Sequence, residues 1–253
     1  MPRPADLGVI VEMARAVGRH SVGRMKALVG CCLVAARVTA LRSVVHRTSA
    51  VRLQIGGDFT IRDTRSFPAR QEQALAEEMA QVVNWAYRGK HPERDESAWT
   101  GERHLLTGIR TTAPDVLAML RAARDQGPIA RAILVAGQPS NDNRCIGTVQ
   151  VESSSGEGGS VEADIGLFSV DPDLQGQGLG KALLRAAEEH AAQRMGASCA
   201  VLWVITSRDE LIGWYLRLGY VRTERTAPFP TDANVGVPVS GAELEFVRLE
   251  KQL

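Results

Sequence analysis

The sequence predicts a mixed α/β fold with a meander of strands at its centre, and three observations lead to this prediction. Strand-like and helix-like segments follow one another from residue 58 to the C-terminus. Between 130 and 170, three strand-like runs occur with no helix among them, which differs from a regular βαβ repeat. The 253 residues, 44% of them hydrophobic, are enough to bury the core of such a fold.

The first part of this region is predicted to hold one strand and two helices. Residues 58–64 alternate apolar and polar side chains, as does a strand with one buried face. Pro68 then begins a helical pattern that ends at Gly89. A second helical pattern has Pro114 at its start and Gly127 at its end, the usual positions for these two residue types.

The second part holds the meander and the elements that close the fold. Gly196 and Gly219 each end a helical pattern, because glycine readily takes the left-handed conformation that closes a helix. The predicted elements in chain order are strands over 130–137, 144–153 and 161–170, a helix over 179–196, a strand over 198–206, a helix over 209–219, and two strands within 220–225 and 242–253.

Charge divides the chain into two parts. Residues 1–50 contain eight basic and two acidic residues, a net charge of +6, and the remainder contains 22 basic and 27 acidic residues, a net charge of −5. A mildly acidic body argues against nucleic-acid binding, which requires a basic face. No stretch approaches the roughly 20 apolar residues of a membrane-spanning helix, so we expect no membrane partner.

The basic segment 1–50 is predicted to be an extension, and 51–253 to be the folded domain. A dispensable extension is the favoured interpretation, and a mitochondrial transit peptide, which is also basic and poor in acids, comes next. A secretory signal is the third interpretation, and the late position of the apolar stretch, behind Asp6 and Glu12, argues against both the secretory signal and the transit peptide. We expect a cytoplasmic protein, or a mitochondrial one if this segment is a transit peptide.

The four cysteines show no zinc-binding pattern, and we expect no metal. Cys31 and Cys32 lie in the extension, and Cys145 and Cys199 lie within apolar strand-like runs. Reduced thiols in the core are the simplest interpretation of the latter two, and they fit a reducing compartment.

Residues 170–184, VDPDLQGQGLGKALL, place Gly176, Gly178 and Gly180 between a strand and a helix. The unpaired N–H groups and the dipole of a helix start attract anions, and bare glycines let a phosphate approach the backbone. Lys181 adds a cation. The spacing fits neither a P-loop, since Ala182 follows the lysine, nor the dinucleotide fingerprint.

This segment resembles the Q/R-x-x-G-x-G/A signature of the GNAT superfamily of acyl-CoA N-acyltransferases, with Gln175, Gly178 and Gly180 at its fixed positions. The resemblance implies a central, mostly antiparallel twisted sheet of about six or seven strands flanked by helices. It also implies acetyl-CoA as cosubstrate, with its pyrophosphate on the loop amides and its pantetheine arm and thioester along the end of the preceding strand. The cofactor-binding residues that it implies are Phe168, Ser169, Val170, Gln175, Gly176, Gln177, Gly178, Leu179, Gly180 and Lys181.

A second segment, DELIGWYLRLGYV, is similar to the Y-x-x-x-G-F/Y element of the same family. The resemblance implies that Tyr215 protonates the departing thiolate, with Gly219 and Tyr220 completing the element. Many family members have an asparagine seven residues before the tyrosine, where this chain has Arg208. A solvated charge is the simpler interpretation of Arg208, and a contact to a CoA phosphate is the alternative.

An amine attacks a thioester only after losing a proton, so a base or a water chain is needed near neutral pH. Asp164 is our candidate base, since some family members place a carboxylate six residues before the last valine of this strand. Strand alternation predicts that Asp164, Gly166, Phe168 and Val170 share one face. Glu102 is a second acid that could line the amine pocket.

The sequence therefore predicts an N-acetyltransferase that moves an acetyl group from acetyl-CoA to a primary amine of a small molecule or peptide by direct transfer. The first alternative is an acyl-CoA sensor of the same fold without turnover. The second is a nucleotide-binding protein, which the loop spacing disfavours. The acceptor cannot be identified from the sequence, and a homodimer is left open.

Overall fold

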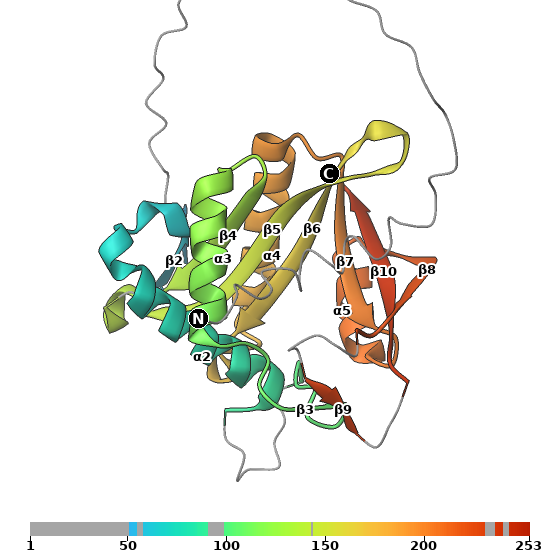
Figure 1. Cartoon of the computed structure of the whole chain (residues 1–253), viewed down its shortest axis with the longest axis horizontal. Helices are drawn as coiled ribbons and strands as arrows, with labels where there is room; N and C mark the ends of the chain where they lie inside the picture. Colours follow the sequence, from blue (N-terminus) through green and yellow to red (C-terminus); the bar gives the residue numbers. More distant parts are fainter. Residues whose placement is uncertain (1–50, 55–57, 91–98, 143, 231–235, 240–242) are drawn as a thin grey trace, which may run out of the picture.

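The computed structural model describes residues 51–253 apart from 55–57, 91–98, 143, 231–235 and 240–242, so the predicted extension over 1–50 lies outside the described residues. An eight-stranded sheet forms the centre of the molecule (Figure 1). Its strands, in spatial order, are β1 (Val51–Gln54), β2 (Asp58–Asp63), β4 (Arg131–Gly137), β5 (Cys145–Ser155), β6 (Val161–Val170), β7 (Cys199–Ile205), β10 (Glu245–Gln252) and β8 (Val221–Pro228).

The mixed fold and the mostly antiparallel sheet are confirmed. Every pair of neighbouring strands in the large sheet is antiparallel except β6 and β7. The sheet has one strand more than the largest predicted number, because β1 pairs with β2 ahead of the first predicted strand. A small second sheet joins β3 (Leu106–Thr107) to β9 (Val237–Pro238), and the sequence did not reveal it.

The four described α-helices fall where the sequence predicts them. They are α2 (Glu72–Arg88), α3 (Ala113–Gln126), α4 (Leu179–His190) and α5 (Asp209–Arg217). At the start of α3, Thr112 and Asp115 form a reciprocal capping box, and Gly127 closes its last turn. The predicted helix over 179–196 is α4 followed by a π-helical turn over Ala191–Met195, which Gly196 ends with a φ of 69°.

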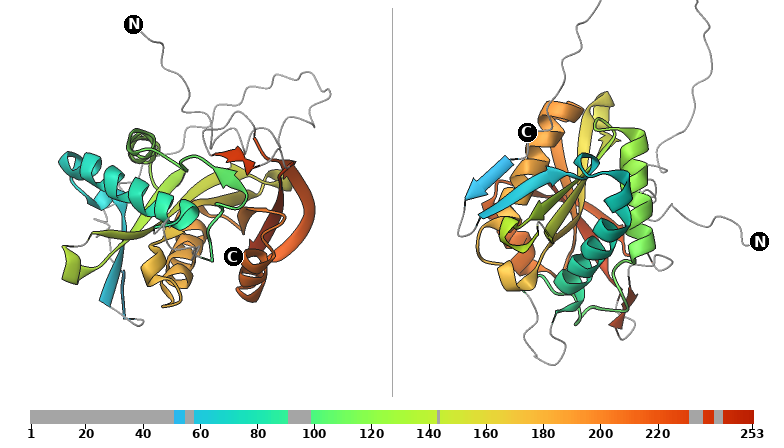
Figure 2. Two further views of the ribbon diagram at one scale, coloured as in Figure 1. Left: turned by 90° about the horizontal axis from the view of Figure 1, so that it is seen from below. Right: turned by 90° about the vertical axis from the view of Figure 1, so that its left-hand side faces the viewer.

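Helices cover both faces of the sheet (Figure 2). On one face, α2 and α3 pack on buried residues of β4 that include Ile133 and Val135. On the other face, α4 packs on Val149 and Val151 of β5. Cys145 is a free, buried thiol, as predicted, and burial raises its pKa to about 12, so it stays protonated.

A β-bulge in β6 changes which side chains share a face. Thr148 of β5 pairs with Ser169 and Gln150 pairs with Gly166, so β6 has one residue more than β5 over this stretch. The extra residue lies at Leu167, which has a φ of 44° and packs against the α2 and α3 side. The bulge therefore reverses the alternation partway along the strand.

The predicted shared face of Asp164, Gly166, Phe168 and Val170 is consequently wrong. Val170 and Phe168 pack against the α4 side, whereas Asp164 pairs with Glu152 on the opposite face. Simple alternation failed because period two holds only while the ladder has no inserted residue.

Strands β6 and β7 pair over only three residue pairs, at Glu162, Ala163 and Asp164. The rest of β6, up to Val170, has no partner in β7. The sheet therefore opens between these two strands beyond Asp164, and the cavities described below lie around this opening.

Candidate active site

The glycine segment forms a turn that leads from the end of β6 into α4. Asp171 caps a short 3-10 turn over Pro172–Leu174. Gly176 has a φ of 76°, and Gly178, the N-cap of α4, has a φ of 86°. Residues other than glycine adopt such φ values only with backbone strain. The first amides of α4, which follow Gly178, have no intrahelical partner, as an anion site requires.

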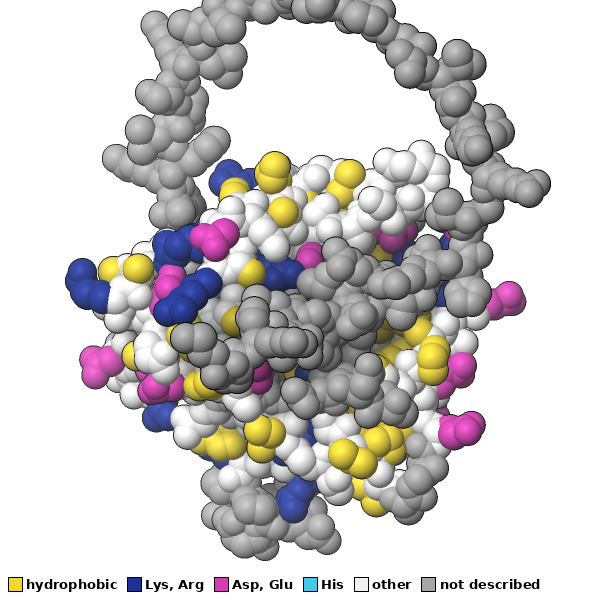
Figure 3. All heavy atoms as spheres, in the orientation of Figure 1, with side chains coloured by type: hydrophobic (Ala, Val, Ile, Leu, Met, Phe, Trp, Pro, Cys, Tyr) yellow, Lys and Arg dark blue, Asp and Glu magenta, His cyan; other side chains and the backbone are white. Residues whose placement is uncertain are grey.

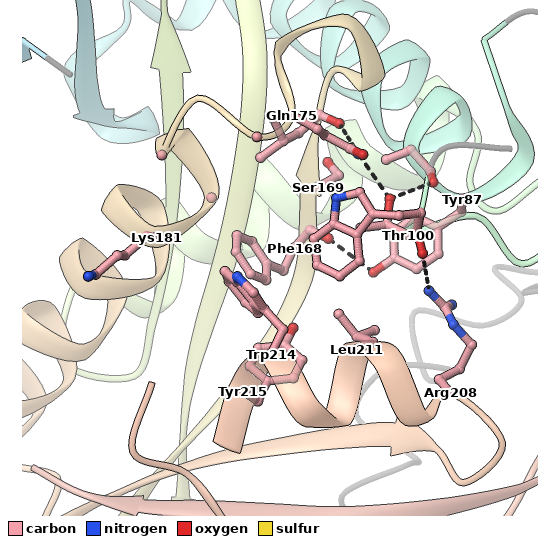
Figure 4. Close-up of a pocket in the computed structure, with 16 residues that line it drawn as sticks. Tyr87, Thr100, Phe168, Ser169, Gln175, Lys181, Arg208, Leu211, Trp214 and Tyr215 are labelled. Carbon is pink, nitrogen blue, oxygen red and sulfur yellow. Dashed lines mark hydrogen bonds between the residues drawn. The ribbon is translucent and has the colours of Figure 1, made fainter. Parts of the chain in front are cut away.

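Side chains hold this turn against the segment that follows α2. The Gln175 amide donates hydrogen bonds to the Val170 carbonyl at 3.2 Å and to the Thr100 hydroxyl at 2.9 Å (Figure 4). Lys90 bonds both carboxylate oxygens of Asp171, at 2.8 and 2.9 Å. The signature glutamine is thus a positioning residue in this structure, since its amide nitrogen bonds protein groups.

A cavity of about 410 Å³ lies beside the turn and contains most of the predicted cofactor-binding residues. Two predicted residues do not line it. Leu179 is buried in the core on the α4 side, and the Gln177 side chain folds back toward the Asp173 carbonyl. The predicted residues that do line it are Phe168, Ser169, Val170, Gln175, Gly176, Gly178, Gly180, Lys181 and Tyr215.

Lys181 lines the cavity at its edge only. Figure 4 shows its ammonium group pointing away from the aromatic side chains, and the residue is exposed. An anion at the start of α4 would therefore contact backbone amides directly, and the Lys181 ammonium group would lie farther away, on the solvent side.

An aromatic wall, made of Trp99, Phe168, Trp214 and Tyr215, closes the other side of this cavity. Trp214 contacts each of the other three rings, with centroid distances of 5.9 Å to Trp99, 6.2 Å to Phe168 and 5.0 Å to Tyr215. Sequence reasoning missed both tryptophans. The available signal was the tryptophan directly before the predicted catalytic tyrosine on an amphipathic helix.

Tyr215 lies where two cavities meet, since it lines both the first cavity and a second one described below. It is 5% exposed, and burial raises its pKa well above the usual range of tyrosine. Gly219, with a φ of 92°, ends α5, and the Tyr220 ring packs edge-on against Tyr215 at 5.6 Å. The three residues of the predicted motif therefore lie together at the end of α5, and burial favours the protonated form of Tyr215.

Tyr87 of α2 was also missed by sequence reasoning, and it lines both cavities too. Its hydroxyl donates a hydrogen bond to the Phe168 carbonyl at 3.1 Å. Burial raises its pKa, and the Arg110 guanidinium lies 5.1 Å from its ring centroid. Tyr87 and Tyr215 thus approach the bulged part of β6 from α2 and α5, respectively.

The second cavity, of about 330 Å³, follows the opening between β6 and β7. Glu102 and Asp164, the two acids considered from the sequence, both line it, and so do Gln150 and Glu152 of β5. Its apolar walls come from Leu202, Val204, Ile205, Leu211, Phe229 and Phe246.

Asp164 lies at the end of this cavity where β6 and β7 are still paired. Burial raises the pKa of its carboxyl, and a hydrogen bond from Ser154 partly offsets this shift. Four residues of strand separate it from Phe168, a span of roughly 10–13 Å. Its role as general base stays a prediction, because direct proton abstraction requires hydrogen-bond distance or a bridging water.

Arg208 is not a solvated charge, which corrects the simpler of the two sequence interpretations. It is 6% exposed and pairs with Glu102 at 3.2 Å. The other carboxylate oxygen of Glu102 pairs with Arg88 of α2, also at 3.2 Å. This buried ion network joins the start of α5 to α2, beside both tyrosines.

Three further observations concern surface charge, metal ligands and membrane-spanning helices in the described part of the chain. On the face shown in Figure 3, basic and acidic side chains are intermixed over α2 and α3. Within the described ranges, no three His, Cys, Asp or Glu side chains gather where they could hold a metal ion. No helix there has the length and apolar character needed to span a bilayer.

A sequence model of the acetyltransferase (GNAT) family matches residues 77–220 of this chain. This stretch includes β4 to β7, the glycine turn and Tyr215. The chain therefore belongs to the GNAT acetyltransferase family, as the two sequence motifs predict.

Two curated relatives are mycothiol acetyltransferases. The one from Saccharomonospora viridis is 27% identical over 62% of this chain, and the one from Salinispora arenicola is 31% identical over 53% of it. The matched region spans 44% of the length of each relative. Among solved structures, the GNAT domain of S. lividans PAT has the same fold, with a TM-score of 0.51 and 20% identity over 84% of this chain and 100% of that one.

Proposed function

We propose that this protein transfers an acetyl group from acetyl-CoA to a primary amine by direct attack of the amine on the thioester. The observation that carries the proposal is the junction of the two cavities at Tyr215. The glycine turn offers backbone amides to the pyrophosphate in the first cavity, and the second offers room for an acceptor.

In the proposed reaction, the amine nitrogen forms a bond to the thioester carbonyl carbon. The carbon–sulfur bond then breaks, and Tyr215 donates its proton to the departing thiolate. The raised pKa of Tyr215 keeps that proton available throughout the neutral range. The amine loses its own proton to solvent or to a base, for which Asp164 is the predicted candidate.

Two relatives carry the name mycothiol acetyltransferase, which supports acetyl transfer as the reaction class. Since this chain spans less than half of their length, their acceptor is not assigned to it. The alternative function is an acyl-CoA sensor without turnover, and the hydroxyl of Tyr215 at the cavity junction favours the enzyme.

The test is release of free CoA thiol from acetyl-CoA by the full chain over a panel of primary amines, with Tyr215→Phe beside it. Amine-dependent thiol release that falls about a hundredfold or more in the variant supports the proposal. Tight acetyl-CoA binding with no release on any amine would favour the sensor.

A further inference from the structure

The second cavity carries opposite charge at its two ends. Among the described residues, Arg110 and Arg208 lie near Tyr87 and Tyr215, together with the carboxylate of Glu102. An ammonium ion is disfavoured at this end, whereas the neutral amine needed for attack on a thioester is not.

The far end, beside Asp164, is acidic. Four carboxylates gather there against two guanidinium groups: Asp164, Glu152, Glu162 and Glu250 against Arg131 and Arg248. Both arginines are engaged by the other three acids, at 2.6 to 2.8 Å. Among the described residues, Asp164 alone in this group has no ion-pair partner, and its carboxyl lines the cavity.

The side chain of Gln150 provides an unmet acceptor beside Asp164. Gln150 is 3% exposed and lines the same cavity, and its side-chain carbonyl oxygen has no hydrogen-bond partner among the described residues. Its amide nitrogen bonds Glu152 at 3.4 Å, which fixes the orientation of the amide. The Asp164 carboxylate receives a hydrogen bond from Ser154 and can accept more, and the buried Gln150 carbonyl has no donor among the described residues. Together these two acceptors favour a ligand group rich in donors, such as an ammonium ion.

The passage between the two ends suits a hydrocarbon chain. Its walls are apolar, and Phe229 and Phe246 stack with their centroids 5.4 Å apart. At Gly166, halfway along, a Cβ atom would have nothing within 4 Å, so the passage there is open. The strand between Asp164 and Phe168 spans roughly 10–13 Å.

From this arrangement we infer that the acceptor is a diamine, which holds one ammonium group at Asp164 and Gln150 and presents the other nitrogen, as neutral amine, beside Tyr215. The inference rests on the proposed function and names its acceptor class. A monoamine would carry its single charge to the acidic end, away from the thioester.

The test compares two probes of one length, diaminooctane and octylamine, titrated calorimetrically into the full chain saturated with CoA. Their hydrocarbon parts are identical, so only the second ammonium group differs. We expect the diamine to bind about tenfold tighter or more, the value of a charge-assisted hydrogen bond. In Asp164→Asn, this ratio should fall close to one, and Gln150→Met should reduce it part of the way. Glu189→Gln, which removes an exposed carboxylate on α4, should leave it unchanged.

Equal binding of the two probes, a preference that survives in Asp164→Asn, or no binding of the diamine overturns the inference. Failure of the proposed function is seen separately, as absence of CoA binding or of thiol release. A pH profile separates recognition from base catalysis. If Asp164 only recognises the ammonium group, Asp164→Asn raises KM for the diamine and kcat still falls at low pH as in the unchanged protein. If Asp164 is the base, the variant loses this fall of kcat at low pH.

Discussion

The side-chain amide of Gln175 lies 2.9 Å from the hydroxyl oxygen of Thr100, and this contact ties the glycine turn to the segment after α2. Gln175→Met keeps the length of the side chain and removes both of its hydrogen bonds. We expect CoA binding to weaken about tenfold, because the turn loses its support, with about 1 kcal/mol of stability lost. Calorimetric titration of CoA checks this, with the exposed Gln73→Met as control. Unchanged CoA affinity would contradict a positioning role.

Gly178 and Gly180 should respond differently to alanine. Gly178 has a φ of 86°, so Gly178→Ala is strained and should lose about 1–2 kcal/mol of stability. At Gly180, a Cβ would meet Val170, Phe168 and Trp214 at 3.7–4.0 Å, an ordinary contact, and Gly180→Ala should stabilise α4 by up to about 1 kcal/mol. Thermal unfolding of the two variants measures the difference. Equal losses at both positions would contradict the account of the turn.

Tyr215→Phe and Tyr220→Phe form a matched pair. Both rings are buried, but the Tyr220 hydroxyl bonds Glu188 at 3.0 Å, whereas the Tyr215 hydroxyl lies at the cavity junction. Tyr215→Phe should lower kcat about a hundredfold or more with little loss of stability. Tyr220→Phe should mainly cost about 1 kcal/mol of stability. A larger fall of kcat in Tyr220→Phe than in Tyr215→Phe would contradict the proposed acid role of Tyr215.

The proposed acid role of Tyr215 and its raised pKa together predict how the activity depends on alkaline pH. A tyrosine whose pKa is raised by folding stays protonated as pH increases, so the acid is not lost near pH 10, where free tyrosine ionises. We expect kcat/KM to rise with pH as the amine loses its proton, without a decrease up to about pH 10. The same shift means that stability is complete below about pH 10 and falls above it. A decrease near pH 9 that Tyr215→Phe abolishes would contradict this.

The buried ion network around Glu102 should be costly to break. Glu102→Gln leaves Arg88 and Arg208 without their shared carboxylate, and we expect a loss of about 3 kcal/mol. Chemical denaturation measures it. The control is Glu189→Gln, whose partner Arg185 is exposed, with an expected change below about 0.5 kcal/mol. Similar changes in the two variants would show that the network adds no stability.

The elements of the fold could be predicted because local signals determine them. Pro114 at the start of α3 and the closing glycines Gly127 and Gly196 place helix ends within a few residues. The additional strand β1 was not predicted, since a four-residue edge strand has too short a pattern to recognise. The bulge at Leu167 was not predicted either, because it depends on pairing with β5.

Only those parts of the candidate site that lie within one continuous segment of sequence could be predicted. The motifs located the glycine turn and Tyr215, since each motif is continuous in sequence. Tyr87, Trp99 and Gln150 reach the cavities from other elements, and no local pattern marks them. For the same reason, sequence alone could not show that Arg208 meets Glu102, which lies 106 residues earlier.

The most direct test of the central claim is a calorimetric titration of the full chain with CoA. We predict that one CoA binds per chain, with affinity reduced about tenfold or more in Gly178→Ala. Absence of binding by a chain that circular dichroism shows to be folded would mean that the glycine turn serves only to connect β6 to α4.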